Sequence, residues 1–365
     1  MSSGAALESI RASAFTVATD GPESDGTLEW DSTTMVLVEA TAGGRTGIGY
    51  TYSHASAAAV INSVLGAAAT GLDALRVGAA GQAMRAAARN LGTTGLVAAA
   101  LSAVDCALWD LKGRLLGLAV VDLLDAARPS VPVYGSGGFC TYTDAQLADQ
   151  LAGWVEQGIG RVKMKVGREP ELDEHRARVA RAAIGPEAEL YVDANGALNR
   201  AQAADWAQRF EQTGVRWFEE PVSSDDLVGL RHVRERVPPG MDVAAGEYGW
   251  DVPYFARMLD AEAVSCLQVD VTRCGGFSGF LAAAALCASR GVDVSAHCAP
   301  QLSVHGCAAA PRLRHLELFH DHDRVEQMVF DGCLRPVGGA LEPDRSRPGA
   351  GLDVRWADIE RWRVG

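Results

Sequence analysis

The second half of the chain alternates between short apolar runs and longer stretches whose apolar residues recur at helical spacing. The runs lie at residues 131–134, 162–166, 190–193, 215–219, 243–246, 267–270, 292–295 and 315–318. Strands that alternate with helices pair in parallel through right-handed crossovers. Eight such units predict an α/β fold, a closed (β/α)8 TIM-type barrel at residues 129–319. A doubly wound open sheet stays the alternative, because a count of strands does not show closure.

The first part of the chain has a different pattern. Residues 11–18, 35–41 and 47–52 have the composition of strands, and helical spacing runs from 55 to about 124. Between the first two strands, residues 20–30 are polar and contain glycine, which predicts a loop. We therefore expect an α+β domain at residues 1–128. Residues 320–365 hold no further strand–helix unit, and we expect them to return to this domain.

Composition excludes several classes of protein. The chain is 48% hydrophobic and 22% charged, as globular proteins are, and its net charge of −13 disfavours nucleic-acid binding. The first residues lack a basic segment followed by an apolar one, and the most apolar stretches are too short to span a bilayer. The eight cysteines are scattered without a Cys-x-x-Cys pair. These features predict a cytoplasmic protein with reduced thiols that binds a small molecule, not a nucleic acid or a membrane.

Ionisable residues stand at or just after seven of the expected strand ends, once every 20 to 28 residues. They are Lys165, Asp193, Glu219, Glu247, Asp270, His297 and Glu317. In a parallel barrel all strand C-termini open on one face, and that face holds the active site. Each residue alone is typical of a solvated loop, but the series predicts a common site.

Three of these residues, Asp193, Glu219 and Glu247, come from consecutive strands and are expected to be neighbours. Carboxylates that lie so close repel one another unless they are protonated or neutralised by a cation. Oxygen ligands without Cys or His suit Mg²⁺, with Mn²⁺ as a substitute. Three unrelated surface acids are the alternative interpretation.

Groups suited to proton transfer flank the three acids. Lys163 and Lys165 lie two residues apart and therefore share one face of a strand, which here is the barrel interior. Neighbouring ammonium groups lower each other's pKa, so we expect Lys165 to serve as a base. On the other side, Asp270 would orient His297 for proton transfer. A protonated Glu317 would donate a hydrogen bond to a developing oxyanion.

This layout suits removal of a proton next to a carboxylate, because a central cation would neutralise the second negative charge of the enediolate. A Schiff-base aldolase that uses Lys165 is a second possibility. It does not need three adjacent carboxylates, and the chain shows no glycine-rich phosphate loop after the seventh expected strand. A metal-binding scaffold without enzymatic activity is the third possibility.

At these residues the sequence resembles the enolase superfamily, and within it the mandelate racemase subgroup. Lys163 and Lys165 match its Lys-x-Lys, Asp193 and Asn195 its Asp-x-Asn, Glu219-Glu-Pro221 its Glu-Glu-Pro, Gly246-Glu247 its third metal ligand, Asp270 with His297 its dyad, and Glu317 its last-strand glutamate. Residues 100–114 look like the family's helix that leads into the barrel. The resemblance implies a magnesium-dependent enzyme whose first domain caps the barrel.

Two positions refine the resemblance. Asp125 stands where the family usually has Gly, at the end of an early helical segment. Asp270 stands at the sixth strand end instead of a lysine, which argues against the muconate-cycloisomerase and dipeptide-epimerase subgroups.

The resemblance does not decide between two reactions, that of a lyase and that of an isomerase. With a 2,3-dihydroxy acid, His297 would protonate the departing hydroxyl, as a dehydratase requires; with a 2-hydroxy acid it would reprotonate the opposite face, as a racemase or epimerase requires. The resemblance also implies that the loops at 20–30 and 50–54 select the substrate. The first loop has four acids and no Lys or Arg, which favours a monoacid sugar over a diacid.

Several residues are candidates for contact with this carboxylic acid substrate. They are Asn195, Ser136, Trp30, Tyr52 and His54. We also expect a homo-oligomer.

Overall fold

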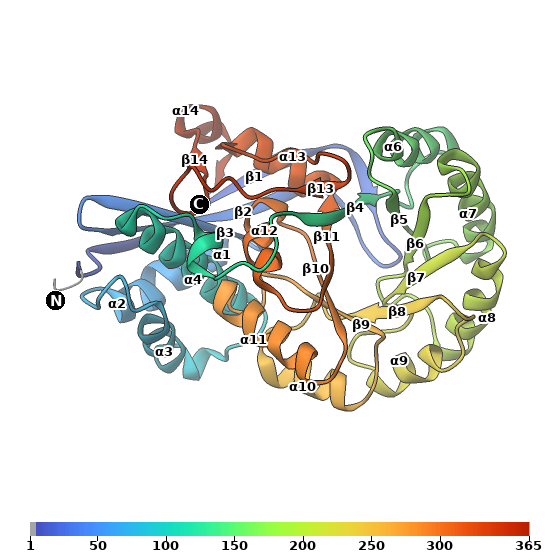
Figure 1. The fold of residues 1–365 in the computed structure, drawn as a ribbon, viewed down its shortest axis with the longest axis horizontal. Helices are drawn as coiled ribbons and strands as arrows, with labels where there is room; N and C mark the ends of the chain where they lie inside the picture. Colours follow the sequence, from blue (N-terminus) through green and yellow to red (C-terminus); the bar gives the residue numbers. More distant parts are fainter. Residues whose placement is uncertain (1–4, 365) are drawn as a thin grey trace.

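The structure, a computed structural model, describes residues 5–364. Its N-terminal part is an antiparallel sheet covered by helices, on the left in Figure 1. The sheet contains β1 (Ser9–Ser24), β2 (Glu29–Ala42) and β3 (Arg45–Tyr52). The following helices are α1 (Ser56–Val60), a π-helical turn (Ile61–Leu65), α2 (Gly66–Ala69), α3 (Val77–Ala87), a 3-10 turn (Arg89–Leu91), α4 (Leu96–Leu116) and α5 (Val120–Leu123). The predicted N-terminal α+β architecture is confirmed.

The rest of the chain is dominated by a parallel barrel. Its strands are β4 (Val131–Gly137), β5 (Arg161–Lys165), β6 (Glu189–Asp193), β7 (Val215–Glu219), β8 (Asp242–Ala245), β9 (Cys266–Val269), β10 (Asp293–Ala296) and β11 (Leu313–Phe319). The helices between them are α6 (Asp144–Glu156), α7 (Pro170–Ile184), α8 (Arg200–Glu211), α9 (Leu227–Arg234), α10 (Val252–Asp260), α11 (Gly276–Ser289) and α12 (Pro300–Ala309). Each strand pairs in parallel with the next, and β11 pairs with β4, with Glu317 opposite Tyr134. The barrel is therefore closed, and the open-sheet alternative is excluded.

The expectation of a loop at residues 20–30 is wrong. The first strand continues to Ser24 and the second begins at Glu29, so only a short turn remains between them. The register shifts between Ala18 and Glu23, which marks a bulge in this capping hairpin. The polar composition of this segment is not typical of strands. The hairpin extends over the barrel, where Glu23 and Ser24 are buried but are not part of an apolar core.

The segment after the barrel returns to the N-terminal domain, as expected. It contains α13 (His320–Val329), β12 (Phe330–Asp331), β13 (Ala340–Leu341), β14 (Asp353–Val354), α14 (Trp356–Ile359), a 3-10 turn (Glu360–Trp362) and β15 (Arg363–Val364). The last strand pairs with β1 at Ala14 and Phe15, while β13 adds to the barrel strand β4. Within residues 5–364, the helices lack the combined length and apolar character needed to cross a bilayer.

A close contact between β3 and α4 holds the first domain together. Gly49 on β3 faces the helix so closely that an added Cβ would lie 2.3 Å from the Ala103 carbonyl oxygen. Beside it, the buried Asp110 carboxylate accepts hydrogen bonds from the backbone of Ile48 on β3, at 2.8 Å, and of Ala350 in the C-terminal segment, at 2.6 Å. One helix thus fixes both the sheet and the returning segment.

We predict that Gly49→Ala lowers the free energy of unfolding by at least about 2 kcal/mol, because the new methyl group must displace the backbone of α4. Denaturant unfolding measures this change. Gly78→Ala is the control, since Gly78 lies exposed in α3 with no atom within 4 Å of the added Cβ. This control should be neutral or stabilise the protein by up to about 1 kcal/mol. Equal effects of the two substitutions would contradict the packing argument.

Candidate active site

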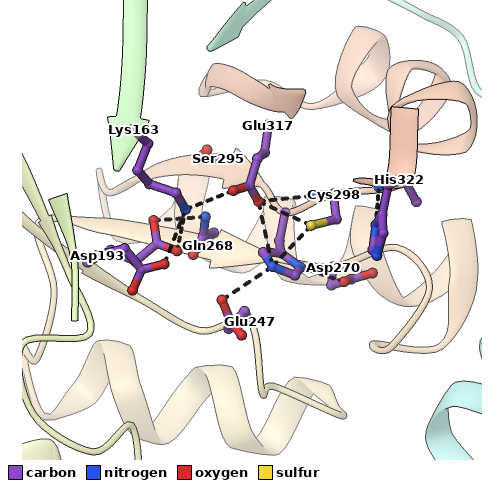
Figure 2. A network of polar contacts seen from close by, with 12 residues as sticks. Lys163, Asp193, Glu247, Gln268, Asp270, Ser295, Cys298, Glu317 and His322 are labelled. Atoms are coloured by element: carbon purple, nitrogen blue, oxygen red, sulfur yellow. Dashed lines mark hydrogen bonds and ion pairs between the residues drawn. The ribbon is translucent and has the colours of Figure 1, made fainter. Parts of the chain in front are cut away.

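The ionisable residues at the strand ends gather at one mouth of the barrel, as Figure 2 shows for Lys163, Asp193, Glu247, Asp270 and Glu317. The strand register produces this arrangement. Lys165 on β5 is paired with Asp193 on β6, and Asp193 is paired with Glu219 on β7. All of these side chains are buried. The parallel pairing of the backbone alone therefore places the lysine ammonium group and the two carboxylates on neighbouring strands, side by side.

The three acids predicted as metal ligands lie together. Asp193, Glu219 and Glu247 each offer a carboxylate oxygen, and these oxygens lie within 4.8 Å of one another. Burial, and then the neighbouring Asp193 carboxylate, raise the pKa of Glu219 to about 8. Glu247 Oε2 is buried without a hydrogen-bond partner among the described residues. An all-oxygen set of three buried carboxylates fits a hard divalent cation such as Mg²⁺ or Mn²⁺.

Neighbouring donors fix the orientation of Glu219. Its Oε2 accepts hydrogen bonds from Trp217 Nε1 at 2.8 Å and from Gln268 Nε2 at 3.2 Å. Its Oε1 lies 2.6 Å from Lys163 Nζ. These contacts hold one carboxylate of the trio in place from inside the barrel, as the supporting residues of metal sites do.

Both lysines are held by carboxylates. Lys163 Nζ lies 2.6 Å from Glu219 and 2.8 Å from Glu317, and Lys165 Nζ lies 2.6 Å from Asp193. Burial by itself lowers the pKa of each ammonium group, but these carboxylates raise the pKa of both lysines above the ordinary value. Lys163 does lower the pKa of Lys165, as expected, but the carboxylates outweigh this effect, so the expected net lowering of the Lys165 pKa is wrong for this arrangement.

On the other side of the trio, Asp270 and His297 form a hydrogen-bonded pair. Asp270 Oδ2 lies 2.6 Å from His297 Nδ1, and Asp270 Oδ1 accepts hydrogen bonds from the backbone and hydroxyl of Thr272. His297 Nε2 lies 3.2 Å from Glu247 Oε2. The carboxylate thus fixes the imidazole ring, and Nε2 faces the acids.

Glu317 is ionised in this arrangement. Burial disfavours the charge, but Lys163 and His297 more than offset that cost and hold the pKa of Glu317 well below its usual value. The protonated state in which Glu317 would donate a hydrogen bond is therefore disfavoured in this arrangement. Its Oε2 instead accepts a hydrogen bond from the Cys298 backbone at 3.2 Å.

A cavity of about 270 Å³ opens above these groups, between the capping hairpin and the barrel. The hairpin side supplies Asp25, Leu28, Trp30, Ser32 and Thr33. The barrel side supplies Lys165, Asn195, Glu247, Tyr248, Arg273, His297, Cys298, Glu317, Phe319 and His322. The first domain therefore covers the site with small polar side chains and one tryptophan.

The five candidate substrate contacts fall into two groups. Trp30 and Asn195 line the cavity. Ser136 is buried in β4, in the barrel wall, and does not line it. Tyr52 lies behind His322, with the two rings stacked at 3.5 Å between centroids. His54 is exposed on the first domain and contacts Ser56.

Sequence reasoning missed several residues at the site. Arg273 lines the cavity, with its guanidinium 3.5 Å from Asp270 and 3.4 Å from Glu247. Its spacing of three residues from Asp270 was the available signal. Glu220, the second glutamate of the Glu-Glu-Pro motif, is buried at a positive φ of 37°. His322, the third residue of α13, had no signal in the sequence.

Comparison with known proteins identifies the family. Residues 16–125 match the model of the mandelate racemase/muconate lactonizing enzyme N-terminal domain, and residues 146–358 match the enolase C-terminal domain-like model. The chain therefore belongs to the mandelate racemase/muconate lactonizing enzyme family, within the enolase superfamily. Asp125, where the family usually has Gly, adopts a φ of 56°, in the left-handed region that favours Gly.

Individual relatives are similar over most of their length. A 3,6-anhydro-alpha-L-galactonate cycloisomerase of Streptomyces coelicolor is 32% identical, over 88% of this chain and 89% of the relative. The crystal structure of a mandelate racemase/muconate lactonizing enzyme-like protein from Rubrobacter xylanophilus has a TM-score of 0.96 and 52% identity, over 98% of this chain and all of that one. L-talarate/galactarate dehydratase from Salmonella typhimurium, solved with Mg and L-lyxarohydroxamate, has a TM-score of 0.90 and 26% identity, over 99% and 94% of the two chains.

We predict that Glu219→Gln lowers Mg²⁺ affinity by more than about 10-fold, because it removes one of three anionic oxygen donors. Calorimetric titration of the metal-free protein with Mg²⁺ measures this change. Glu211→Gln, at the exposed end of α8, removes the same charge away from the site and should leave the affinity unchanged. Equal affinities of the two variants would contradict the assignment of the trio.

Proposed function

We propose that this chain is a magnesium-dependent enzyme that removes the proton alpha to a carboxylate through an enediolate intermediate, and that it dehydrates a monoacid sugar to a 2-keto-3-deoxy acid. One observation carries the proposal. Lys165 and the His297–Asp270 pair stand on opposite sides of the same three carboxylates. Two proton-transfer groups that flank a cation site suit this chemistry. The cycloisomerase and dehydratase relatives act on sugar acids, according to their names, which supports the reaction class; the galactonate of the first is a monoacid and the galactarate of the second a diacid.

In this proposal Asp193, Glu219 and Glu247 hold the cation. A bound Mg²⁺ would supply a Lewis acid that stabilises negative charge on the substrate carboxylate. Lys165 now donates a hydrogen bond from its ammonium group to Asp193, so it first loses one proton to solvent and then removes the alpha proton as the neutral amine. His297, oriented by Asp270, donates a proton to the hydroxyl that leaves the neighbouring carbon as water. The resulting enol converts to the 2-keto acid.

The cavity favours a polyhydroxy monoacid. Its cations are already engaged, since Lys165 contacts Asp193 and Arg273 contacts Asp270 and Glu247. Burial, and then the positive His297, lower the pKa of His322 to about 3, so this ring is neutral. A second substrate carboxylate would have to compete with these contacts. Ser32, Thr33 and Asn195 instead offer hydrogen-bonding groups suited to hydroxyls.

The racemase of a 2-hydroxy acid is the second candidate, because the same opposed groups allow His297 to return a proton to the other face. Incubation with acid sugars and hydroxy acids, Mg²⁺ and deuterated water separates the two reactions. A 2-keto-3-deoxy product establishes the dehydratase. Alpha-deuterium in recovered substrate or epimer without that product establishes the racemase. Neither product nor exchange with any acid of either class would overturn the proposal.

We predict that Lys165→Gln and His297→Asn each lower turnover by about 10² to 10⁴-fold while the protein still binds Mg²⁺, because each removes one proton-transfer group. Steady-state rates and calorimetric titration measure the two effects. Lys112→Gln is the control, since the chain has three lysines and Lys112 lies on α4 over the Trp109 ring. Unchanged turnover in both site variants would place the chemistry elsewhere.

The distant alternative, a Schiff-base aldolase, predicts a different result. Borohydride added with a carbonyl substrate would then reduce an imine and attach the substrate irreversibly to Lys165. We expect no such adduct on the wild-type protein or on Lys112→Gln by mass spectrometry. An adduct lost in Lys165→Gln would favour the aldolase.

A further inference from the structure

A second group of metal-binding residue types lies outside the cavity, at the junction of the capping hairpin and the barrel. Asp20 and Glu23 belong to β1, and His320 is the first residue of α13, directly after the last barrel strand. His320 Nε2 lies 2.9 Å from Asp20 Oδ2. Each of the three residues offers one ligand atom, and these atoms lie within 4.8 Å of one another, as they do in the Asp193–Glu219–Glu247 trio.

The buried Glu23 carboxylate provides an independent indication of a ligand. Its side chain is fully buried, and its Oε2 accepts a hydrogen bond from Trp30 Nε1 at 2.8 Å. Its Oε1 is also buried and has no hydrogen-bond partner among the described residues. An orphaned buried carboxylate oxygen is costly, and a cation in contact with it removes that cost.

We propose that Asp20, Glu23 and His320 form a second cation site, separate from the three carboxylates at the barrel mouth. The donor set is one imidazole nitrogen and two carboxylate oxygens. Imidazole suits Zn²⁺ and related transition metals, whereas Mg²⁺ prefers oxygen ligands alone. The site therefore takes Zn²⁺, or another transition-metal ion that accepts nitrogen, with water in the remaining positions.

An ion can reach this place from solvent. The side chains of Asp20 and His320 are 50% and 26% exposed, while Glu23 forms the closed inner end. Asp20 and His320 also line a surface hollow of about 570 Å³ with Tyr142 and Gln146. The site thus has an open side for water ligands and a closed side formed by the buried Glu23 carboxylate.

A cation here would join the capping hairpin to the barrel. The same part of the hairpin already bonds to the loop after β4, where Thr141 Oγ1 donates to the Pro22 carbonyl at 2.6 Å and Cys140 N donates to the Ser24 carbonyl at 2.9 Å. A bound ion adds a link to α13 on the neighbouring side. Because Glu23 also holds Trp30, which lines the active-site cavity, the ion fixes one wall of that cavity.

The test uses the full chain, stripped of metal and dialysed against Zn²⁺ with excess Mg²⁺ to occupy the barrel-mouth trio. We expect wild type to retain one Zn²⁺ per chain by elemental analysis, and His320→Gln and Asp20→Asn to lose it. His175→Gln is the matched control. His175 pairs with Asp144 at 2.7 Å on the surface, outside any three-residue cluster of the described chain, so this variant should retain the ion.

Two further measurements distinguish this site from the trio. Glu219→Gln should still retain Zn²⁺ that depends on His320, and Zn²⁺ should raise the melting temperature of wild type but not of His320→Gln. Absence of retained Zn²⁺ in wild type would overturn the proposal. So would Zn²⁺ that persists in both His320→Gln and Asp20→Asn, or that disappears in Glu219→Gln while His320→Gln keeps it. None of these results depends on which substrate the enzyme uses.

Discussion

Charge compensation at the mouth of the barrel is the constraint on which the rest of the site depends. Four carboxylates and two ammonium groups are removed from water there, and each would be costly alone. Lys163, fully buried, forms ion pairs with both Glu219 and Glu317, and Lys165 forms an ion pair with Asp193. Glu247 keeps a buried oxygen without a hydrogen bond. Among these groups the carboxylates outnumber the ammonium groups by two, which is the charge that a divalent cation carries.

The closed barrel makes this charge compensation possible because the strand pairing determines which charged residues are neighbours, whatever rotamers their side chains adopt. Parallel pairing aligns Lys165, Asp193 and Glu219 across three strands. Trp217 and Gln268, further inside the barrel, then orient Glu219 from below. The capping hairpin adds the opposite wall, so the reacting groups come from the barrel and most of the groups suited to substrate hydroxyls come from the first domain.

The sequence was sufficient to predict eight strand–helix units and the clustering of ionisable residues at the strand ends, because both follow from the periodic spacing of strands. Closure of the barrel was established only by the pairing of β11 with β4. The sequence did not predict the protonation of Lys165 or Glu317, since a pKa depends on distances between side chains from different strands. The strands of the capping hairpin were not predicted for another reason. Its strands lie over a polar cavity and carry Glu23 and Ser24 inward, so the alternation of apolar residues that reveals a strand is missing. His322 reaches the cavity from α13, after the last barrel strand, where no spacing rule points to it, whereas Arg273 had only its distance of three residues from Asp270 as a signal.

The pairing of β15 with β1 has a practical consequence for protein engineering. β1 runs from that pairing, at Ala14 and Phe15, directly into the hairpin that covers the cavity. A purification tag or fusion partner placed directly after β15 would therefore adjoin the strand at the edge of this sheet. A large group placed there can disturb β1 and, through it, the hairpin over the active-site cavity, although the cavity residues lie far away along the chain. An insertion in an exposed helix–strand connection of the barrel has no such link to β1.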